Sequence, residues 1–363
     1  MYNNHIAYLN EKTPYLVMES GKVVHALETF QRLFGEKNVY YAVKANPDKS
    51  LIQLLSEHGG NFEVSSSGEL DLMREIGILS ERMISAGTIK TAGFIKSAFE
   101  SGVRYFTADC TSEVESIARY APGSKLVVRL AVMNTGSEWP LERKFGVNIS
   151  EAVKLLEKAR TSGLTPWGLS FHVGSQCTLP GTWLDAMDTA RSAWDLAEKK
   201  DIHLQSLNLG GGFPVEYRKS VPEIDEFARV IFKGLKEKVP DARDILVEPG
   251  RAITGHAGTM VATVIAKAMR NRRRWLYLDV GLFNGLMESI GGIKYPIVAG
   301  RQGKLYKWIL AGPSCDGLDV IDKDVYLPDV EIGERVLIMS AGAYTTAYAS
   351  AFGGAPIPQV YML

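Results

Sequence analysis

An alternation of short apolar runs with amphipathic helical stretches is the feature that most constrains how this chain folds. The helical stretches include Ser50–His58, Gly68–Ile76, Glu151–Arg160 and Trp183–Lys199. The eight predicted strands are Val39–Lys44, Asn61–Ser65, Arg82–Ala86, Val103–Asp109, Lys125–Ala131, Pro166–His172, His203–Leu209 and Asp244–Glu248. Eight successive β-then-α units predict a closed (β/α)8 barrel of the TIM type. A doubly wound open sheet is the alternative, but no GxGxxG sequence follows the first strand to support it.

The pattern changes after about Thr254, where strand-like runs are separated by Gly, Pro and Asp turns with little helix between them. These runs are Met260–Ala268, Trp275–Val280, Tyr306–Ala311 and Arg335–Met339. We therefore expect a (β/α)8 barrel domain over residues 20–253 and an all-β barrel or sandwich domain over residues 254–363. Residues 1–19 form an N-terminal segment whose strand, Pro14–Met18, is expected to join the β-domain.

Composition excludes several classes of protein. The chain of 363 residues has 41 basic and 41 acidic residues, which argues against nucleic acid as the main partner because binding of a nucleic-acid backbone normally shows as a basic excess. No apolar run reaches the ~18 residues that span a bilayer, and the N-terminus is polar. The three cysteines, Cys110, Cys177 and Cys315, form no disulfide framework. We expect a cytoplasmic protein with no membrane partner and no metal site.

Polar side chains gather at the predicted carboxyl ends of the barrel strands, which is where this fold carries its chemistry. One polar strand end is usually a solvated cap, whereas six or seven on one rim indicate a functional site. The set comprises Lys44, Glu63, Asp109, Arg129, His172, the triplet Gly210-Gly211-Gly212 and Glu248.

Two of these features predict a cofactor that carries an aldehyde and a phosphate. Lys44 follows an apolar run, and partial desolvation there would lower its pKa and favour a Schiff base with an aldehyde. The glycine triplet after strand seven and Arg251 after strand eight stand where this fold binds phosphate.

Three further residues fit a flat, aromatic cofactor. The imidazole of His172 can stack on an aromatic ring, and Ser175 can reach a phosphate. Glu248 can keep a pyridine nitrogen protonated, so that the ring accepts electrons. Together with the lysine and the phosphate cradle, these residues predict pyridoxal 5′-phosphate (PLP).

At this point the chain resembles the alanine-racemase-like (type III) PLP enzymes, and within them the ornithine/lysine/diaminopimelate decarboxylase family, closest to its ornithine/lysine branch. Six segments carry the resemblance in the family's order, and they span nearly the whole chain. They are Tyr41-Ala42-Val43-Lys44-Ala45-Asn46, Phe171-His172-Val173-Gly174-Ser175, Gly210-Gly211-Gly212-Phe213-Pro214, Glu248-Pro249-Gly250-Arg251, Gly312-Pro313-Ser314-Cys315-Asp316-Gly317-Leu318-Asp319 and Gly342-Ala343-Tyr344.

The resemblance implies roles for individual residues. Lys44 would hold PLP as a Schiff base, His172 would stack on its ring and Arg129 would lie near its phenolic oxygen. Glu69 would lie behind Lys44 and Glu63. The implied cofactor-binding residues are Lys44, Glu63, Arg129, His172, Ser175, Gly210, Gly211, Gly212, Glu248, Gly250, Arg251 and Tyr344.

The resemblance also implies a head-to-tail homodimer with two shared sites. Cys315 and Asp316 would reach from the β-domain into the neighbouring subunit. There Cys315 would protonate the carbanion left by CO2, and Asp316 would bind the distal cation of the substrate. Racemases of this type use a tyrosine as second base and usually an arginine at the pyridine nitrogen. The residues Glu248 and Cys315-Asp316 therefore favour decarboxylation.

The predicted function is decarboxylation of a basic amino acid such as ornithine, lysine or arginine, giving CO2 and a diamine or other polyamine precursor. One departure from the family is that Glu288-Ser289 replaces the Tyr-Asp pair whose aspartate binds the distal amine. Glu288 either binds that amine from a different height or points to solvent, and the sequence leaves both open. A second departure is Glu63, which stands where the family usually has aspartate.

Two alternative functions stay open from sequence alone. The replaced pair motivates a decarboxylase of a conjugated or carrier-bound amino acid in siderophore or antibiotic biosynthesis. A non-catalytic regulatory binder of the polyamine pathway is the alternative of another class, although such a relative is expected to lose the lysine or the phosphate glycines. Asp109, Cys110 and Cys177 receive no role.

Overall fold

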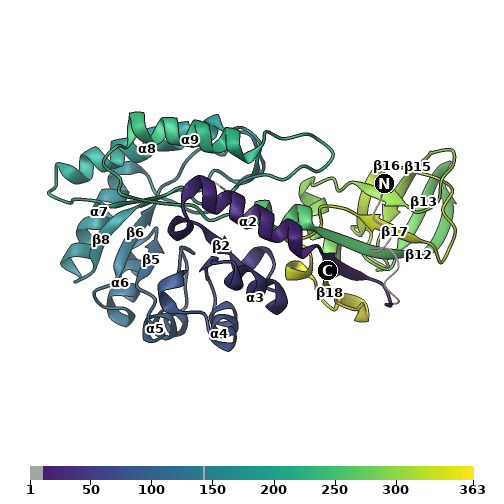
Figure 1. Ribbon diagram of the computed structural model, residues 1–363, viewed down its shortest axis with the longest axis horizontal. Helices are drawn as coiled ribbons and strands as arrows, with labels where there is room; N and C mark the ends of the chain where they lie inside the picture. The colour runs from purple at the N-terminus through teal and green to yellow at the C-terminus, as the bar shows by residue number, and fades with distance from the viewer. Residues whose placement is uncertain (1–10, 142–143) are drawn as a thin grey trace.

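The computed structural model describes residues 11–141 and 144–363. The first ten residues of the predicted N-terminal segment lie outside the described residues. A barrel with its surrounding helices and a β-rich part lie side by side along the long axis of the molecule (Figure 1). The barrel comes first in the chain and the β-rich part second.

Eight parallel strands form the barrel, and each lies within a predicted strand or shares most of its residues. They are β2 (Tyr40–Ala42), β3 (Asn61–Glu63), β4 (Met83–Ile84), β5 (Tyr105–Ala108), β6 (Lys125–Arg129), β8 (Thr165–Ser170), β10 (Ser206–Asn208) and β11 (Asp244–Leu246). Two runs of adjacent strands, β2-β3-β4 and β5-β6-β8-β10-β11, are joined by the parallel bridges Ser85↔Phe106 and Val39↔Val247. These bridges close the sheet, so the (β/α)8 fold is correct and the open-sheet alternative is wrong.

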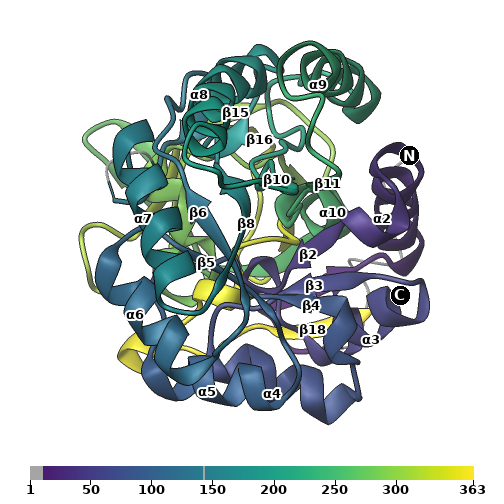
Figure 2. The same ribbon diagram turned by 90° about the vertical axis from the view of Figure 1, so that its left-hand side faces the viewer.

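Helices surround the strands, as Figure 2 shows in a view into the barrel. They are α2 (Ser20–Phe34), α3 (Lys49–Glu57), α4 (Ser67–Ile76), α5 (Ala92–Glu100), α6 (Thr111–Tyr120), α7 (Ile149–Thr161), α8 (Gly181–Glu198), α9 (Ile224–Lys238) and the short α10 (Arg251–Thr254). Side chains of Asp48, Ser66, Thr91 and Asn148 accept backbone N–H groups and start α3, α4, α5 and α7. Among the described residues, we find no helix with the length and apolarity needed to cross a membrane.

The interior of the barrel is separate from the main core. Six strands contribute to one cluster made of Ile84, Tyr105, Val127 and Leu246, with the half-buried Tyr40 and Trp167 packed against it. Alternate residues of a strand face opposite sides, so a closed sheet has one layer inside and another against the helices. The strand ends that carry the polar side chains therefore stand above a packed interior.

The β-rich part is built around the long strand β12 (Gly258–Arg270), which runs through two neighbouring sheets. Its other strands are β13 (Arg273–Leu278), β14 (Ile297–Ala299), β15 (Tyr306–Ala311), β16 (Val320–Leu327) and β17 (Arg335–Ile338), in the order β14-β17-β12-β13-β15-β16. The N-terminal strand β1 (Tyr15–Met18) pairs with β12 and with the C-terminal strand β18 (Gln359–Met362). A separate two-stranded ladder joins β7 (Ser137–Trp139) to β9 (Ser175–Cys177) near the barrel rim.

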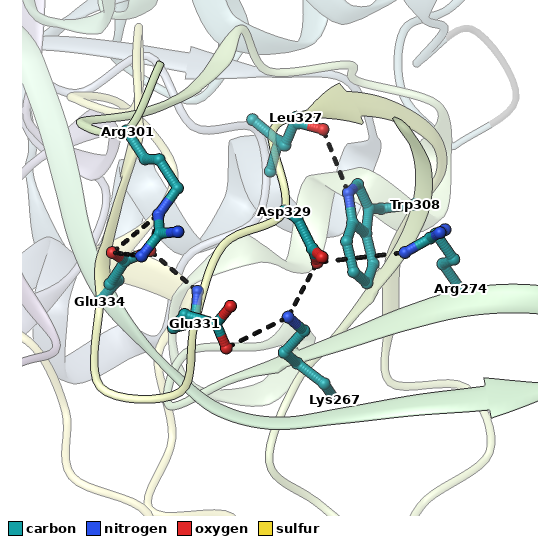
Figure 3. Close-up of polar contacts among 8 residues, drawn as sticks. All are labelled: Lys267, Arg274, Arg301, Trp308, Leu327, Asp329, Glu331 and Glu334. Carbon is teal, nitrogen blue, oxygen red and sulfur yellow. Dashed lines mark hydrogen bonds and ion pairs between the residues drawn. The ribbon is translucent and has the colours of Figure 1, made fainter. Parts of the chain in front are cut away.

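Surface ion pairs hold the loop between β16 and β17 in the β-rich part (Figure 3). Lys267 of β12 contacts Asp329 at 2.8 Å and Glu331 at 3.4 Å. Arg301 binds both carboxylate oxygens of Glu334, at 2.7 to 3.1 Å. These pairs are partly exposed and screened by water, so they orient the loop more than they stabilise the fold.

An aromatic cluster joins two outer helices to the segment after the glycine triplet. Trp183 of α8 is fully buried and stacks on Phe213 with ring centroids 4.9 Å apart. Phe227 of α9 packs against the edge of the Trp183 ring at 5.5 Å. The cluster therefore fixes the backbone that leads away from the glycines.

We predict that Trp183→Ala lowers the free energy of unfolding by about 3–5 kcal/mol, because it leaves a large cavity in this cluster. Denaturant unfolding followed by circular dichroism measures the loss. The matched control is Lys96→Ala on the exposed face of α5, which is expected to change stability by less than about 0.5 kcal/mol. A loss at Trp183 no larger than that of the control would contradict the packing described.

Candidate active site

Lys44 lies in a helical turn, Val43–Ala45, directly after β2, and not within the strand that the sequence predicted. Its Nζ lies 2.6 Å from Oε2 of Glu63, which ends β3 and is fully buried. Burial disfavours the charged amine, but the negative charge of Glu63, aided by Tyr344 and Glu248, raises the pKa of Lys44 above its usual range. The predicted lowering of this pKa is therefore wrong in the cofactor-free protein, because the ammonium has a carboxylate partner.

A chain of hydrogen bonds stands behind the Lys44–Glu63 pair. The Ser65 hydroxyl donates to Oε1 of Glu63, and the backbone N–H of Ser65 donates to Glu69 at 2.6 Å. The Ala86 N–H also donates to Glu63, at 3.3 Å. Although burial opposes ionisation of Glu63, Lys44 and these donors together lower the pKa of its carboxyl. Glu63 is thus held as a carboxylate facing the amine.

Glu248 follows β11 on the same rim and has a different electrostatic environment. Burial and the charge of Glu63 raise the pKa of Glu248 to about 7. Its Oε1 accepts a hydrogen bond from Asn208 Nδ2 at 2.5 Å, and Asn208 Oδ1 accepts the N–H of Gly210 at 2.9 Å. Asn208 therefore ties Glu248 to the glycine triplet. Sequence reasoning missed Asn208, although its place two residues before the triplet was a signal.

Only glycine fits the triplet. A Cβ at Gly210 would lie 2.3 Å from the carbonyl oxygen of Phe171, and one at Gly212 would lie 2.4 Å from that of Gly174. Both residues also have positive φ, at 65° and 98°. The backbone is therefore packed closely against the segment that carries His172, in the form of a cradle for an anion.

His172 is held as a neutral ring. Burial, together with the charges of Arg129 and Lys44, lowers the pKa of His172 well below its usual value. Its Nδ1 accepts the N–H of Gly174 at 3.0 Å. A neutral imidazole fixed in this way suits contact with a flat aromatic ring.

Arg251 begins α10, and its side chain is 3% exposed. Its Nη2 donates to Ser175 Oγ at 3.0 Å, and its guanidinium carbon lies 4.8 Å from the Tyr344 ring centroid. The structure thus brings three predicted phosphate-binding residues together. Tyr344 has φ +55°, in the left-handed region that non-glycine residues adopt only uncommonly.

In the structure Glu288 pairs with Arg251 of the same chain. Its two carboxylate oxygens accept hydrogen bonds from Nη1 and Nη2 of Arg251, at 2.7 and 2.6 Å. The side chain is 3% exposed, so within this chain it does not point to solvent. A contact between Glu288 and the substrate amine stays a prediction.

The remaining predicted residues fall in two places. Arg129 ends β6, and the charges of Glu248, Asp109 and Glu63 act on it. Burial lowers the pKa of Arg129, although the guanidinium stays charged. Cys315 and Asp316 are exposed on the loop between β15 and β16, where the Asp316 carboxylate accepts the N–H of Leu318 at 2.8 Å. Within one chain these two residues stay outside the buried charge cluster.

The residues at this rim fit PLP. The Nε–H of Arg251 is buried without an acceptor in the described part of the chain, which is a donor that a phosphate oxygen can satisfy. The N–H of Gly210 already bonds Asn208, so Gly211 and Gly212 would offer backbone N–H groups, and Lys44 would offer an amine to the aldehyde. Glu248, whose pKa responds to nearby charge, offers a carboxylate to the pyridine nitrogen.

Known proteins match this chain over most of its length. The family model described as pyridoxal-dependent decarboxylase, pyridoxal binding domain, matches residues 20–255. The lysine/ornithine decarboxylase of Selenomonas ruminantium is 36% identical over 346 residues, covering 94% of this chain and 87% of that protein. A crystal structure of the S. ruminantium lysine decarboxylase with PLP and cadaverine is 34% identical, with a TM-score of 0.92, and covers 100% of this chain and 94% of that one.

A more distant structure has the same fold with a different ligand. The arginine decarboxylase of Paramecium bursaria Chlorella virus, bound to agmatine, is 28% identical with a TM-score of 0.92. The match covers 99% of this chain and 100% of the viral one.

We predict that Glu248→Gln stabilises the cofactor-free protein increasingly as the pH rises from about 4.5 to about 7. The raised pKa means that folded wild-type protein binds a proton that the unfolded chain releases, so wild-type stability falls across this window. The gain above pH 7 is on the order of 3 kcal/mol.

Denaturant unfolding of the cofactor-free proteins between pH 5 and pH 8 measures this difference. Glu100→Gln, at the exposed end of α5, is the control and is expected to alter stability little. A difference between Glu248→Gln and wild type that stays constant over this range would contradict the raised pKa.

Proposed function

This chain belongs to the family of pyridoxal-dependent decarboxylases, and from that premise we propose that it decarboxylates free lysine or ornithine. It is a PLP-dependent enzyme that acts on a basic amino acid. The main observation behind this assignment is that Lys44, Glu248 and the Gly210–Gly212 cradle meet on one rim of the barrel. In addition, the chain matches a lysine/ornithine decarboxylase along 94% of its length. The lysine/ornithine and arginine decarboxylases among the relatives do not favour the carrier-bound or the non-catalytic alternative.

Residues of the barrel would bind and orient the cofactor. Lys44 would bind the aldehyde carbon, and His172 would stack on the face of the ring. The glycine cradle and Arg251 would bind the phosphate. Bound PLP supplies an electron sink for the bond that breaks at Cα. Glu248 would hold the proton on the pyridine nitrogen, and the resulting positive charge would lower the pKa of Glu248 from its cofactor-free value of about 7.

The remaining groups would come from a second copy of the chain, which supports a homodimer. Cys315 and Asp316 are exposed in this chain, outside its buried cluster of charged side chains. In a shared site the Cys315 thiol would deliver a proton to Cα after CO2 leaves, and the Asp316 carboxylate would bind the distal ammonium of the substrate.

The product and the exposed thiol suggest the cellular setting. Loss of CO2 from lysine or ornithine would give cadaverine or putrescine, and a diamine product supports a role in polyamine biosynthesis. All three cysteines are free in the structure, and Cys315 is exposed. A thiol that must stay reduced to deliver its proton fits the cytoplasm.

We predict that PLP-loaded protein converts L-lysine or L-ornithine to the corresponding diamine faster than it converts L-arginine, L-2,4-diaminobutyrate or diaminopimelate. Mass spectrometry of the amines and CO2 release measure the reaction. Cys315→Ala is expected to lower kcat by 10²-fold or more, because the proton donor is lost. Cys177→Ala is the matched control, since Cys177 is a buried free thiol to which no catalytic role is assigned. Absence of amine from every free amino acid would overturn the proposal.

We predict that an inactive Lys44→Ala protein and a weakly active Cys315→Ala protein regain activity when mixed. Random exchange makes half of the dimers mixed, and each mixed dimer has one intact site, so about a quarter of wild-type activity returns. Denaturing and refolding the two variants together, followed by the diamine assay, provides the measurement. If the mixture is no more active than the sum of the separate variants, Cys315 does not act across an interface.

A further inference from the structure

The guanidinium of Arg251 is engaged by protein groups at both of its terminal nitrogens. Nη1 donates to Tyr217 Oη at 2.6 Å and to Glu288 Oε2 at 2.7 Å. Nη2 donates to Glu288 Oε1 at 2.6 Å and to Ser175 Oγ at 3.0 Å. Four N–H groups of this arginine are therefore satisfied, and only its Nε–H lacks an acceptor among the described residues.

Glu288 joins the β-rich part of the chain to the barrel. It lies in the helical turn Met287–Gly291, beyond β13, whereas Arg251 starts α10 directly after the last barrel strand. Tyr217 comes from the loop after the glycine triplet and packs edge-on against Tyr295, with ring centroids 5.5 Å apart. Three segments far apart in the chain thus meet at one guanidinium.

This contact fixes an orientation as well as a charge. A guanidinium is planar, so binding both terminal nitrogens to the two oxygens of one carboxylate sets the direction of the remaining Nε–H. Both side chains are 3% exposed, and a buried arginine without a carboxylate would be costly. Ser175 and Tyr344, which contact the same group, place it at the phosphate end of the proposed cofactor site.

We propose that Glu288 is a positioning residue for the phosphate anchor: it holds the Arg251 guanidinium in the orientation that receives the cofactor phosphate, and it does not bind the substrate amine. The proposal rests on the PLP site of the proposed function. Asp316 of a second copy is then left as the carboxylate that binds the distal ammonium of the substrate. The Glu288-Ser289 departure accordingly concerns the cofactor and not the substrate.

The test is a titration of cofactor-free Glu288→Gln with PLP, followed by tryptophan fluorescence and by absorbance of the bound cofactor. Glutamine is isosteric, but its amide N–H2 faces another donor, so the guanidinium loses one of its two fixed contacts. We expect the Kd for PLP to rise on the order of tenfold or more, while the ratio of kcat/KM for lysine to that for ornithine stays within about twofold at saturating PLP.

Two further variants separate positioning from a general loss of structure. Tyr217→Phe removes one acceptor from Arg251 and is expected to weaken PLP binding in the same direction but less. In an Arg251→Met background, Glu288→Gln is expected to have no further effect on PLP affinity, because Glu288 acts through the arginine. Thermal unfolding of each cofactor-free variant identifies any variant that fails to fold. If Glu288→Gln fails to fold, the PLP affinity of Tyr217→Phe tests the proposal instead.

Three results would overturn the inference. One is a Kd for PLP unchanged in both Glu288→Gln and Tyr217→Phe. Another is a lysine-to-ornithine ratio that changes tenfold while PLP affinity does not, which would return Glu288 to the substrate. The third is an undiminished effect of Glu288→Gln in the Arg251→Met background. Failure of the proposed function is distinguishable, because wild-type protein would then bind PLP without producing a diamine, or would not bind PLP at all.

Discussion

Closure of the barrel between its first and last strands is the contact on which the site depends. The Tyr40 N–H donates to the carbonyl of Val247 at 2.9 Å, and the Ala42 N–H donates to that of Pro249 at 3.1 Å. These bonds place Lys44 and Glu248, which lie far apart in the sequence, on neighbouring strand ends. Without closure, the amine and the carboxylate would lie at opposite edges of a sheet.

Closure also crowds charges that water would otherwise separate. The charge of Glu63 acts on Glu248, and burial disfavours the ionised form of both carboxyls. Lys44 and two further donors hold Glu63 ionised, while Glu248 accepts a side-chain hydrogen bond from the amide of Asn208. Their pKa values therefore move in opposite directions, which is the electrostatic basis for giving two similar side chains different tasks.

The β-rich part supplies two groups of side chains: one contacts Arg251 of the same chain, and the other is exposed at the surface. It packs Glu288 and Tyr344 against Arg251 of its own chain, and it presents Cys315 on an exposed loop. The first contact prepares the place of the phosphate. The second leaves the Cys315 thiol exposed, outside the buried charged side chains of its own chain.

Short-range signals were sufficient for much of the fold. Strand and helix periodicity located the eight barrel strands, and residues such as Asp48 and Ser66 begin helices because their side chains cap the N–H groups two or three positions ahead. The ends of the strands were less well predicted, and Lys44 lies in a turn beyond β2. A strand stops where its backbone no longer hydrogen-bonds to a neighbouring strand, and side-chain type does not set that point. The tight turn at the glycine triplet was also predictable from sequence, because three successive glycines indicate a backbone that leaves no room for a side chain.

The hydrogen-bond and ion-pair partners of the charged residues could not be predicted from sequence in the same way. The sequence determined that a lysine, two glutamates, a histidine and a glycine triplet stand at strand ends, because local pattern sets where strands stop. Only the tertiary structure decided that Glu288 pairs with Arg251, that Glu63 raises the pKa of Lys44 and that Asn208 supports Glu248. Each of these depends on side chains brought together from distant parts of the chain, where burial and the nearest opposite charge govern the energy of an ionised group.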